Sequence, residues 1–157
     1  MSDSIWKLVD RSEAAIDPAL ALTFVSDPAF GGLCLFVGKV RESNLGKPVL
    51  GISYDVFAPL ALNGFGQLVQ QASAEFGPRI RVYLAHAHGR LAVGDVAVVV
   101  AVGTPHRDAA FKACRQIIEA VKHQSPIWKQ EHYLDGDSEW SEGCSLCDTH
   151  THDDAPH

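Results

Sequence analysis

The sequence has no long apolar run and no excess of positive charge. None of its apolar stretches approaches the roughly 20 residues that a bilayer-spanning helix needs, so the sequence predicts no membrane span. The 157 residues carry a formal net charge of −6, which argues against a nucleic acid as the main partner. The start of the chain lacks the basic segment and the apolar stretch of an export signal, so we expect a cytoplasmic protein.

Cysteine is scarce, and several common catalytic motifs are absent. Cys34 and Cys114 lie in apolar segments, so we expect small buried side chains and no disulfide framework, as is usual in a reducing compartment. The chain contains no phosphate-binding loop, no Ser-His-Asp order and no paired-carboxylate signature. Hydrolase and nucleotide-binding functions therefore have no positive support.

The other two cysteines belong to a short C-terminal cluster with two histidines: Cys144, Cys147, His150 and His152. These residue types are zinc ligands, but structural zinc sites usually draw their ligands from two separated segments. The cluster is therefore either a zinc site or a flexible tail that collects metal only in vitro.

Hydrophobic periodicity divides the rest of the chain into strands and helices. The pattern predicts strands over 6–10, 31–41, 49–57, 79–89 and 94–103, helices over 17–27, 60–76 and 104–125, and a short extended segment after Trp128. Strands 31–41 and 49–57 are predicted to be neighbours in the sheet. Because several strands follow one another without a helix between them, we expect an α+β fold with antiparallel pairs.

The length allows one domain and little more. We expect that domain to span residues 1–142. Residues 143–157 lack apolar periodicity, and the sequence predicts a flexible tail there.

The start of the third helix is a candidate anion site. Thr104 is predicted to cap it, with Pro105 in the first turn and with His106 and Arg107 beside the free backbone N–H groups. Those groups and the positive end of the helix dipole favour an anion. The two side chains either bind a phosphate or are merely solvated, and cations are slightly unfavourable to a helix start, which favours binding.

Lys122 lies at the edge of the apolar stripe of the same helix. Partial burial and the nearby Arg115 would lower the pKa of this lysine from about 10.4, which would suit it to proton transfer near neutral pH. The alternative is that its alkyl stem covers apolar surface while the amine stays in water.

Lys129 follows Pro126 and Trp128, so a stiff bend precedes it. If the chain doubles back along the helix, Lys122 and Lys129 converge on one anion or one acyl group. In the alternative, Trp128 fills the core and Lys129 lies in water.

Lys39 and Arg41 close the strand over 31–41. Because they are two residues apart, we expect them to share one face and to form the rim of a site for an anionic ligand. The alternative is ordinary solvation at a strand end.

Four segments, in this order and at these separations, resemble the MoaE family of molybdopterin synthase catalytic subunits. They are FVGKVRESNLG, HAHGRLAVGD, VGTPHRDAAFKA and VKHQSPIWKQE, and the resemblance spans about residues 30–141. It implies an α/β-hammerhead-type fold, with a mixed, largely antiparallel sheet packed against helices.

The resemblance also implies a sulfurtransferase of molybdenum cofactor biosynthesis. A homodimer of such subunits docks two small ubiquitin-like sulfur carriers to form a heterotetramer. The C-terminal Gly-Gly thiocarboxylate of each carrier enters a pocket and gives sulfur to cyclic pyranopterin monophosphate, which becomes the molybdopterin dithiolene. No metal or organic cofactor is required, and zinc at the tail would be an addition.

The family's functional residues match positions in this sequence. Lys122 and Lys129 match the two active-site lysines, and Arg41 matches an arginine that binds substrate. His106 and Arg107 match the pair that completes the pocket from the neighbouring protomer. We expect Pro126 and Trp128 to contact the docked carrier.

The sequence departs from the family pattern in two places. Asp55-Val56-Phe57 stands where the family has Glu-His-Tyr, and His86-Ala87-His88-Gly89 stands where it has His-Arg before the glycine. A second hypothesis is a non-catalytic module that docks the carrier or binds zinc through its tail.

Overall fold

The computed structural model describes residues 3–136 and 138–142, which form eight strands and three helices. The strands are β1 (Ile5–Asp10), β2 (Gly32–Lys39), β3 (Ser43–Asn44), β4 (Lys47–Val56), β5 (Arg81–Ala92), β6 (Val96–Thr104), β7 (Ile127–Tyr133) and β8 (Ser138–Glu142). The helices are α1 (Pro18–Phe24), α2 (Ala58–Phe76) and α3 (Arg107–Gln124). Within these residues, no helix combines the length and the apolar character that crossing a bilayer would require.

The strands form one sheet in the order β2-β6-β5-β4-β7-β8, with β1 parallel to β5 and β3 paired with β4. Every pair except β1–β5 is antiparallel, which confirms the predicted α+β fold. The prediction that strands 31–41 and 49–57 are neighbours is wrong. β2 pairs with β6, while β5 and β7 occupy the two edges of β4, so long-range pairing overrides closeness in the sequence.

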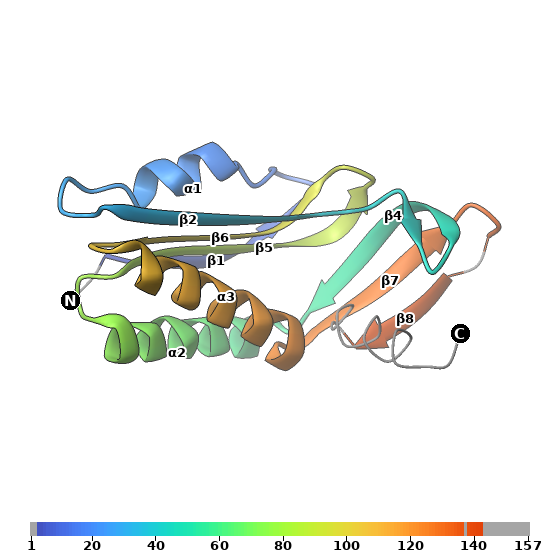
Figure 1. Ribbon diagram of the computed structural model, residues 1–157. Coiled ribbons are helices and arrows are strands. Elements are labelled where there is room, and N and C mark those ends of the chain that lie inside the picture. The colour runs from blue at the N-terminus through green and yellow to red at the C-terminus, as the bar shows by residue number, and fades with distance from the viewer. Residues whose placement is uncertain (1–2, 137, 143–157) are drawn as a thin grey trace, which may run out of the picture.

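Strand β5 joins two parts of the sheet. Its residues from Arg81 to His86 pair with β6, and those from Gly89 to Ala92 pair with β4. The change of partner coincides with Gly89, whose φ of 92° is a conformation that favours glycine. Beyond this point β4, β7 and β8 run at an angle to β2 and β6 (Figure 1).

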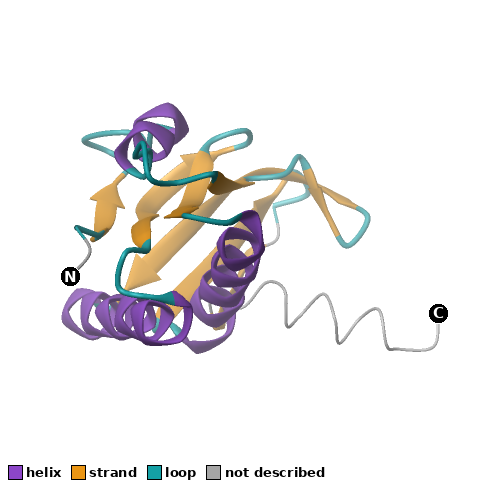
Figure 2. Ribbon diagram, turned by 60° about the vertical axis from the view of Figure 1, so that its left-hand side comes forward, coloured by secondary structure: helices purple, strands orange, loops and turns teal. Residues whose placement is uncertain are grey.

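The helices cover both faces of the first part of the sheet. Helix α1 lies on one face, and α2 and α3 lie together on the other (Figures 1 and 2). Helix α3 packs through a buried stripe at helical spacing: Ala110, Ala113, Cys114, Ile117, Ile118, Ala120 and Val121. Its last turn therefore ends close to the junction between the two parts of the sheet.

The start of α3 differs from the prediction. The helix begins at Arg107 with His106 as its N-cap, and no side chain caps it. Thr104 does not cap the helix because it is the buried last residue of β6, paired with Gly32 of β2. Its Oγ1 atom donates a hydrogen bond to the His106 carbonyl, at 2.6 Å.

The sequence predicts only a short extended segment after Trp128, whereas the structure has two strands there, β7 and β8. Strand β7 has seven residues and lies between β4 and β8. Its sequence, IWKQEHY, is too polar to be recognised as a buried strand, yet Ile127, Lys129 and Glu131 all point inward.

Candidate active site

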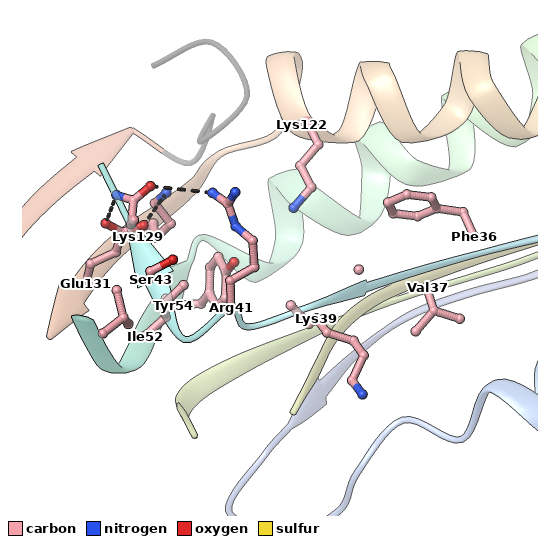
Figure 3. A pocket seen from close by; sticks show the side chains of 14 residues that line it. Phe36, Val37, Lys39, Arg41, Ser43, Ile52, Tyr54, Lys122, Lys129 and Glu131 are labelled. Atoms are coloured by element: carbon pink, nitrogen blue, oxygen red, sulfur yellow. Dashed lines mark hydrogen bonds and ion pairs between the residues drawn. The ribbon is translucent and has the colours of Figure 1, made fainter. Parts of the chain in front are cut away.

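A pocket of about 460 Å³ opens where the two parts of the sheet meet the end of α3 (Figure 3). Its charged lining residues are Lys39, Arg41, Lys122, Lys129 and Glu131, and its apolar and aromatic walls include Phe36, Val49, Ile52 and Tyr54. Four cationic residues and one anionic residue give the pocket a net positive charge. Such a lining favours an anionic ligand.

Lys122 lies in the last turn of α3 and reaches into this pocket (Figure 3). Burial, together with the charge of Lys129, lowers the pKa of this lysine to about 8. The predicted direction of the shift is confirmed. The second cation is Lys129, however, and not Arg115, which is exposed on the same helix.

Lys129 is 4% exposed, so the alternative that placed it in water is wrong. It pairs with Tyr54 across the β4–β7 ladder, and the alternation of β7 turns it inward. Its Nζ atom lies 3.0 Å from Oε1 of Glu131. The predicted convergence of Lys122 and Lys129 on one pocket is confirmed.

Trp128 faces away from the pocket because neighbouring residues of a strand point to opposite sides. Its side chain is 39% exposed, so it neither walls the pocket nor fills the core. Pro126 lines a different groove, together with Leu60 and Leu68 of α2. The docking roles of Pro126 and Trp128 remain predictions.

Glu131 is the centre of a hydrogen-bond network that the sequence analysis missed. Its Oε2 atom accepts hydrogen bonds from the Asn44 amide and the Tyr133 hydroxyl. The Asn44 side-chain amide also donates to the Tyr133 hydroxyl oxygen at 3.0 Å, and the Arg41 guanidinium donates to Oδ1 of Asn44 at 3.4 Å. The network fastens the β3 turn, and with it Arg41, to β7 (Figure 3). Only the alternation of inward residues along β7 could have indicated Glu131.

Tyr54 and His86 are two uncharged aromatic side chains near Lys122 and Lys129. Burial, together with the charge of Glu131, raises the pKa of Tyr54 to about 12. Burial lowers the pKa of His86 to about 3, with a contribution from Lys122. The two rings meet edge to face at 5.0 Å, and a ring nitrogen of His86 lies 2.7 Å from the Ala87 carbonyl. Both side chains are therefore uncharged near neutral pH.

The departures from the family pattern lie outside the pocket lining. Asp55 and Phe57 are exposed, and Asp55 pairs with the outward-facing Trp128. Ala87, which stands where the family has arginine, is buried in the core.

The prediction that Lys39 and Arg41 share one face is wrong. The register of β2 against β6 shifts between Gly38 and Lys39, and β2 ends at Lys39. Arg41 therefore lies beyond the end of the strand, where the alternation of strand side chains no longer fixes its direction. Figure 3 shows Arg41 turned toward the space below Lys122, whereas Lys39 runs to the other side of β2. Arg41 is thus the better placed of the two for a ligand in the pocket.

His106 and Arg107 lie at the opposite end of α3, in a separate exposed pocket with Gly31, Pro105 and Phe111. Arg107 and Lys122 are fifteen residues apart on one helix, or about 22 Å along its axis. Within one chain the structure does not bring this pair to the lysines.

The four predicted metal ligands, Cys144, Cys147, His150 and His152, lie outside the described residues. Across residues 3–136 and 138–142, no group of three or more His, Cys, Asp or Glu side chains could hold a metal ion. Cys34 and Cys114 are both free thiols in the structure.

Comparison with known proteins identifies the family. A family model described as MoaE protein matches residues 11–124. The molybdopterin synthase catalytic subunit of Synechococcus elongatus is 44% identical over 88% of this chain and 84% of its own length. That of a Nostoc species is 39% identical over 80% of this chain and 82% of its own length.

Solved structures agree with these relatives. The crystal structure of molybdopterin synthase from Staphylococcus aureus superimposes with a TM-score of 0.79 at 29% identity, covering 87% of this chain and 96% of that one. The sequence relatives, the matched family model and the shared fold all lead to one conclusion: the chain belongs to the MoaE family.

Proposed function

We propose that this chain is the catalytic subunit of a molybdopterin synthase that acts in the cytoplasm. In this reaction, sulfur from the C-terminal thiocarboxylate of a small ubiquitin-like carrier is transferred to cyclic pyranopterin monophosphate, which becomes the molybdopterin dithiolene. The observation that carries the proposal is the meeting of Lys122 and Lys129 in one cationic pocket. Family membership supplies the identity of the reaction.

The cations of the pocket suit both anionic reactants. The substrate brings a phosphate and the carrier brings a thiocarboxylate, and each needs a positive partner in a partly desolvated site. Arg41 is held at the pocket mouth through Asn44, which is itself bonded to Glu131. We assign Arg41 to the substrate, and Lys39 only to the outer rim.

Lys122 is the candidate for proton transfer. As sulfur attacks the pterin side chain, an oxygen leaves and must receive a proton. The group that gave this proton must later take one up again before the next turnover. An amine whose pKa is about 8 populates both protonation states near neutral pH. The attack joins the carrier to the pterin through a thioester. Water then cleaves the bond between the carrier's acyl carbon and the sulfur, which leaves the sulfur on the pterin and a carboxylate on the carrier; in a side reaction the Lys122 amine cleaves the same bond and forms an amide.

Lys129 has a different role in this proposal. Its ion pair with Glu131 fixes the position of its ammonium group, so it acts as a stationary charge that orients the carrier terminus. No metal or organic cofactor has a part in these steps.

We assign His106 and Arg107 to the lysine pocket of a second copy of the chain. Because they lie about 22 Å from Lys122 along α3, they can contribute only to the lysine pocket of a neighbouring protomer. We therefore propose a homodimer of catalytic subunits, each with one docked carrier.

The test is reconstitution with thiocarboxylated carrier and cyclic pyranopterin monophosphate. Lys122→Ala should abolish dithiolene formation, because it removes the proton-transferring amine, while the circular dichroism spectrum stays unchanged. Lys112→Ala is the matched control, since Lys112 is exposed on the same helix and pairs with Asp108 on the helix surface. Dithiolene formation at the normal rate by Lys122→Ala would remove this residue from the mechanism.

A further inference from the structure

Two thiols meet between β2 and α3, away from the charged lining of the pocket. Cys34 is partly exposed on β2, and Cys114 is 3% exposed on α3. The two side chains lie within hydrogen-bonding reach of each other. The Cys114 Sγ atom also lies 3.5 Å from the Val100 carbonyl oxygen, to which it donates.

The packing of α3 on β2 explains this meeting. A Cβ atom added to Gly32 would lie 2.6 Å from the Arg107 Cα atom, so the start of the helix presses directly on the strand. Cys34 is two residues beyond Gly32 and shares its strand face, while Cys114 is seven residues beyond Arg107 and shares its helix face. Both cysteines therefore point into the same layer.

The strand register places the two sulfurs at neighbouring levels. Cys34 is opposite Val102 of β6, and the next inward residue of β2, Phe36, is opposite Val100. Because Cys114 donates to the Val100 carbonyl, its sulfur lies no more than about one strand repeat from the level of Cys34 along the strand.

The environments of the two thiols differ. Burial, together with the neighbouring Cys34, raises the pKa of Cys114 to about 12. Cys114 is therefore protonated and shielded from solvent. Cys34 has the greater exposure, so a dissolved oxidant reaches it first.

We propose that Cys34 and Cys114 form a site of reversible oxidation, at which a hydroperoxide produces a disulfide between β2 and α3. In the first step the Cys34 sulfur takes one oxygen from the peroxide, giving a sulfenic acid and releasing water or an alcohol. In the second step the Cys114 sulfur attacks that sulfur and displaces its hydroxyl, which leaves as water with the Cys114 proton. The two thiols supply the two electrons that the peroxide accepts.

The disulfide would tie together two elements that reach the lysine pocket. Strand β2 leads to Arg41, and α3 ends with Lys122. The link would close a long loop, from residue 34 to residue 114, and would restrict the unfolded chain. This inference does not depend on the sulfur-transfer reaction.

The experiment treats the full-length protein with hydrogen peroxide, blocks the remaining thiols, and maps the peptides without reduction. We expect one linked peptide pair that contains Cys34 and Cys114, is lost on treatment with dithiothreitol, and accompanies a rise in Tm. The double variant Cys144→Ser/Cys147→Ser should still form the link. Cys34→Ser, with Cys34→Ala as a second version, should lose the link and leave Cys114 unmodified.

Three results would overturn the proposal. The first is oxidation of Cys34 to sulfinic acid with no link to Cys114. The second is a link that joins Cys34 only to a cysteine of the C-terminal cluster. The third is oxidation of Cys114 in Cys34→Ser at the rate seen in the unmodified sequence, because the buried thiol would then not need its neighbour.

Discussion

The Nζ atom of Lys129 lies 3.0 Å from Oε1 of Glu131, and both side chains point inward from the same strand. A buried ion pair of this kind contributes little net stability, but breaking it leaves an uncompensated charge. The other oxygen of Glu131 accepts hydrogen bonds from Asn44 and Tyr133, so one carboxylate organises the lysine, the β3 turn and the end of β7.

Glu131→Gln should therefore lower the free energy of unfolding by about 3 kcal/mol, because Lys129 loses its counter-charge in a buried setting. Urea denaturation at neutral pH measures the change. Glu75→Gln is the control, since Glu75 is exposed near the end of α2 and should change the value by less than about 0.5 kcal/mol. Equal effects of the two variants would mean that the ion pair has no special importance.

Lys122 should make stability depend on pH. Its pKa falls from 10.5 in the unfolded chain to about 8 in the folded protein, so folding disfavours its protonated form. The cost is fully present below pH 8 and disappears as the pH rises from 8 toward 10.5. Replacing the amine with an apolar group should therefore stabilise the protein at pH 7.

Lys122→Met is the variant that tests this linkage. We expect it to raise the free energy of unfolding at pH 7 by a few kcal/mol, at about 1.4 kcal/mol for each unit of pKa shift, with a smaller gain at pH 10. Lys112→Met, on the exposed face of the same helix, should show no such pH dependence. A gain for Lys122→Met that is constant from pH 7 to 10 would contradict the assigned shift.

Gly32 and Gly64 offer a matched pair of glycine substitutions. At Gly32 an added methyl group would lie 2.6 Å from the Arg107 Cα atom, and backbone cannot move aside cheaply. Gly32→Ala should therefore destabilise the protein by about 2 kcal/mol or more. Gly64, inside α2, has open space around it, and Gly64→Ala should stabilise by about 0.5–1 kcal/mol. Chemical denaturation of both variants checks the opposite signs.

The proposed contribution of Arg107 to the neighbouring protomer's pocket predicts that variants of Lys122 and Arg107 can complement each other. In a mixed dimer of Lys122→Ala and Arg107→Ala chains, one site receives both mutations and the other receives neither. If Arg107 serves the pocket of the other protomer, denaturing and refolding the two variants together should restore up to about a quarter of the activity, since half of the dimers are mixed and each has one intact site. Activity no greater than that of the separate variants would place Arg107 outside the neighbouring site.

The sequence predicts the elements better than their arrangement. The helices over 60–76 and toward Gln124 follow from apolar spacing, and the structure has them close to those bounds. Partner choice in the sheet could not be predicted, because β4 pairs with β5 and β7 through contacts between distant segments. A local pattern carries no information about such pairings.

In the site, too, the sequence indicates individual residues but not the contacts between them. Lys122 could be predicted from its place at the edge of an apolar stripe, and Lys129 from the bend before it. The partners that position them could not, because Asn44 and Glu131 are 87 residues apart in the chain and meet only in the folded structure. The end of β2 at Lys39, two residues before Arg41, likewise has no clear signal in the local sequence.

The outward orientation of Trp128 has a practical consequence. Its indole is covalently adjacent to Lys129 yet lies on the opposite side of β7, in contact with solvent. With Trp6 and Trp140 replaced by phenylalanine, its fluorescence becomes a single optical reporter for that surface. An emission shift on adding a second protein would then report coverage of the outer side of β7, independently of any event in the lysine pocket.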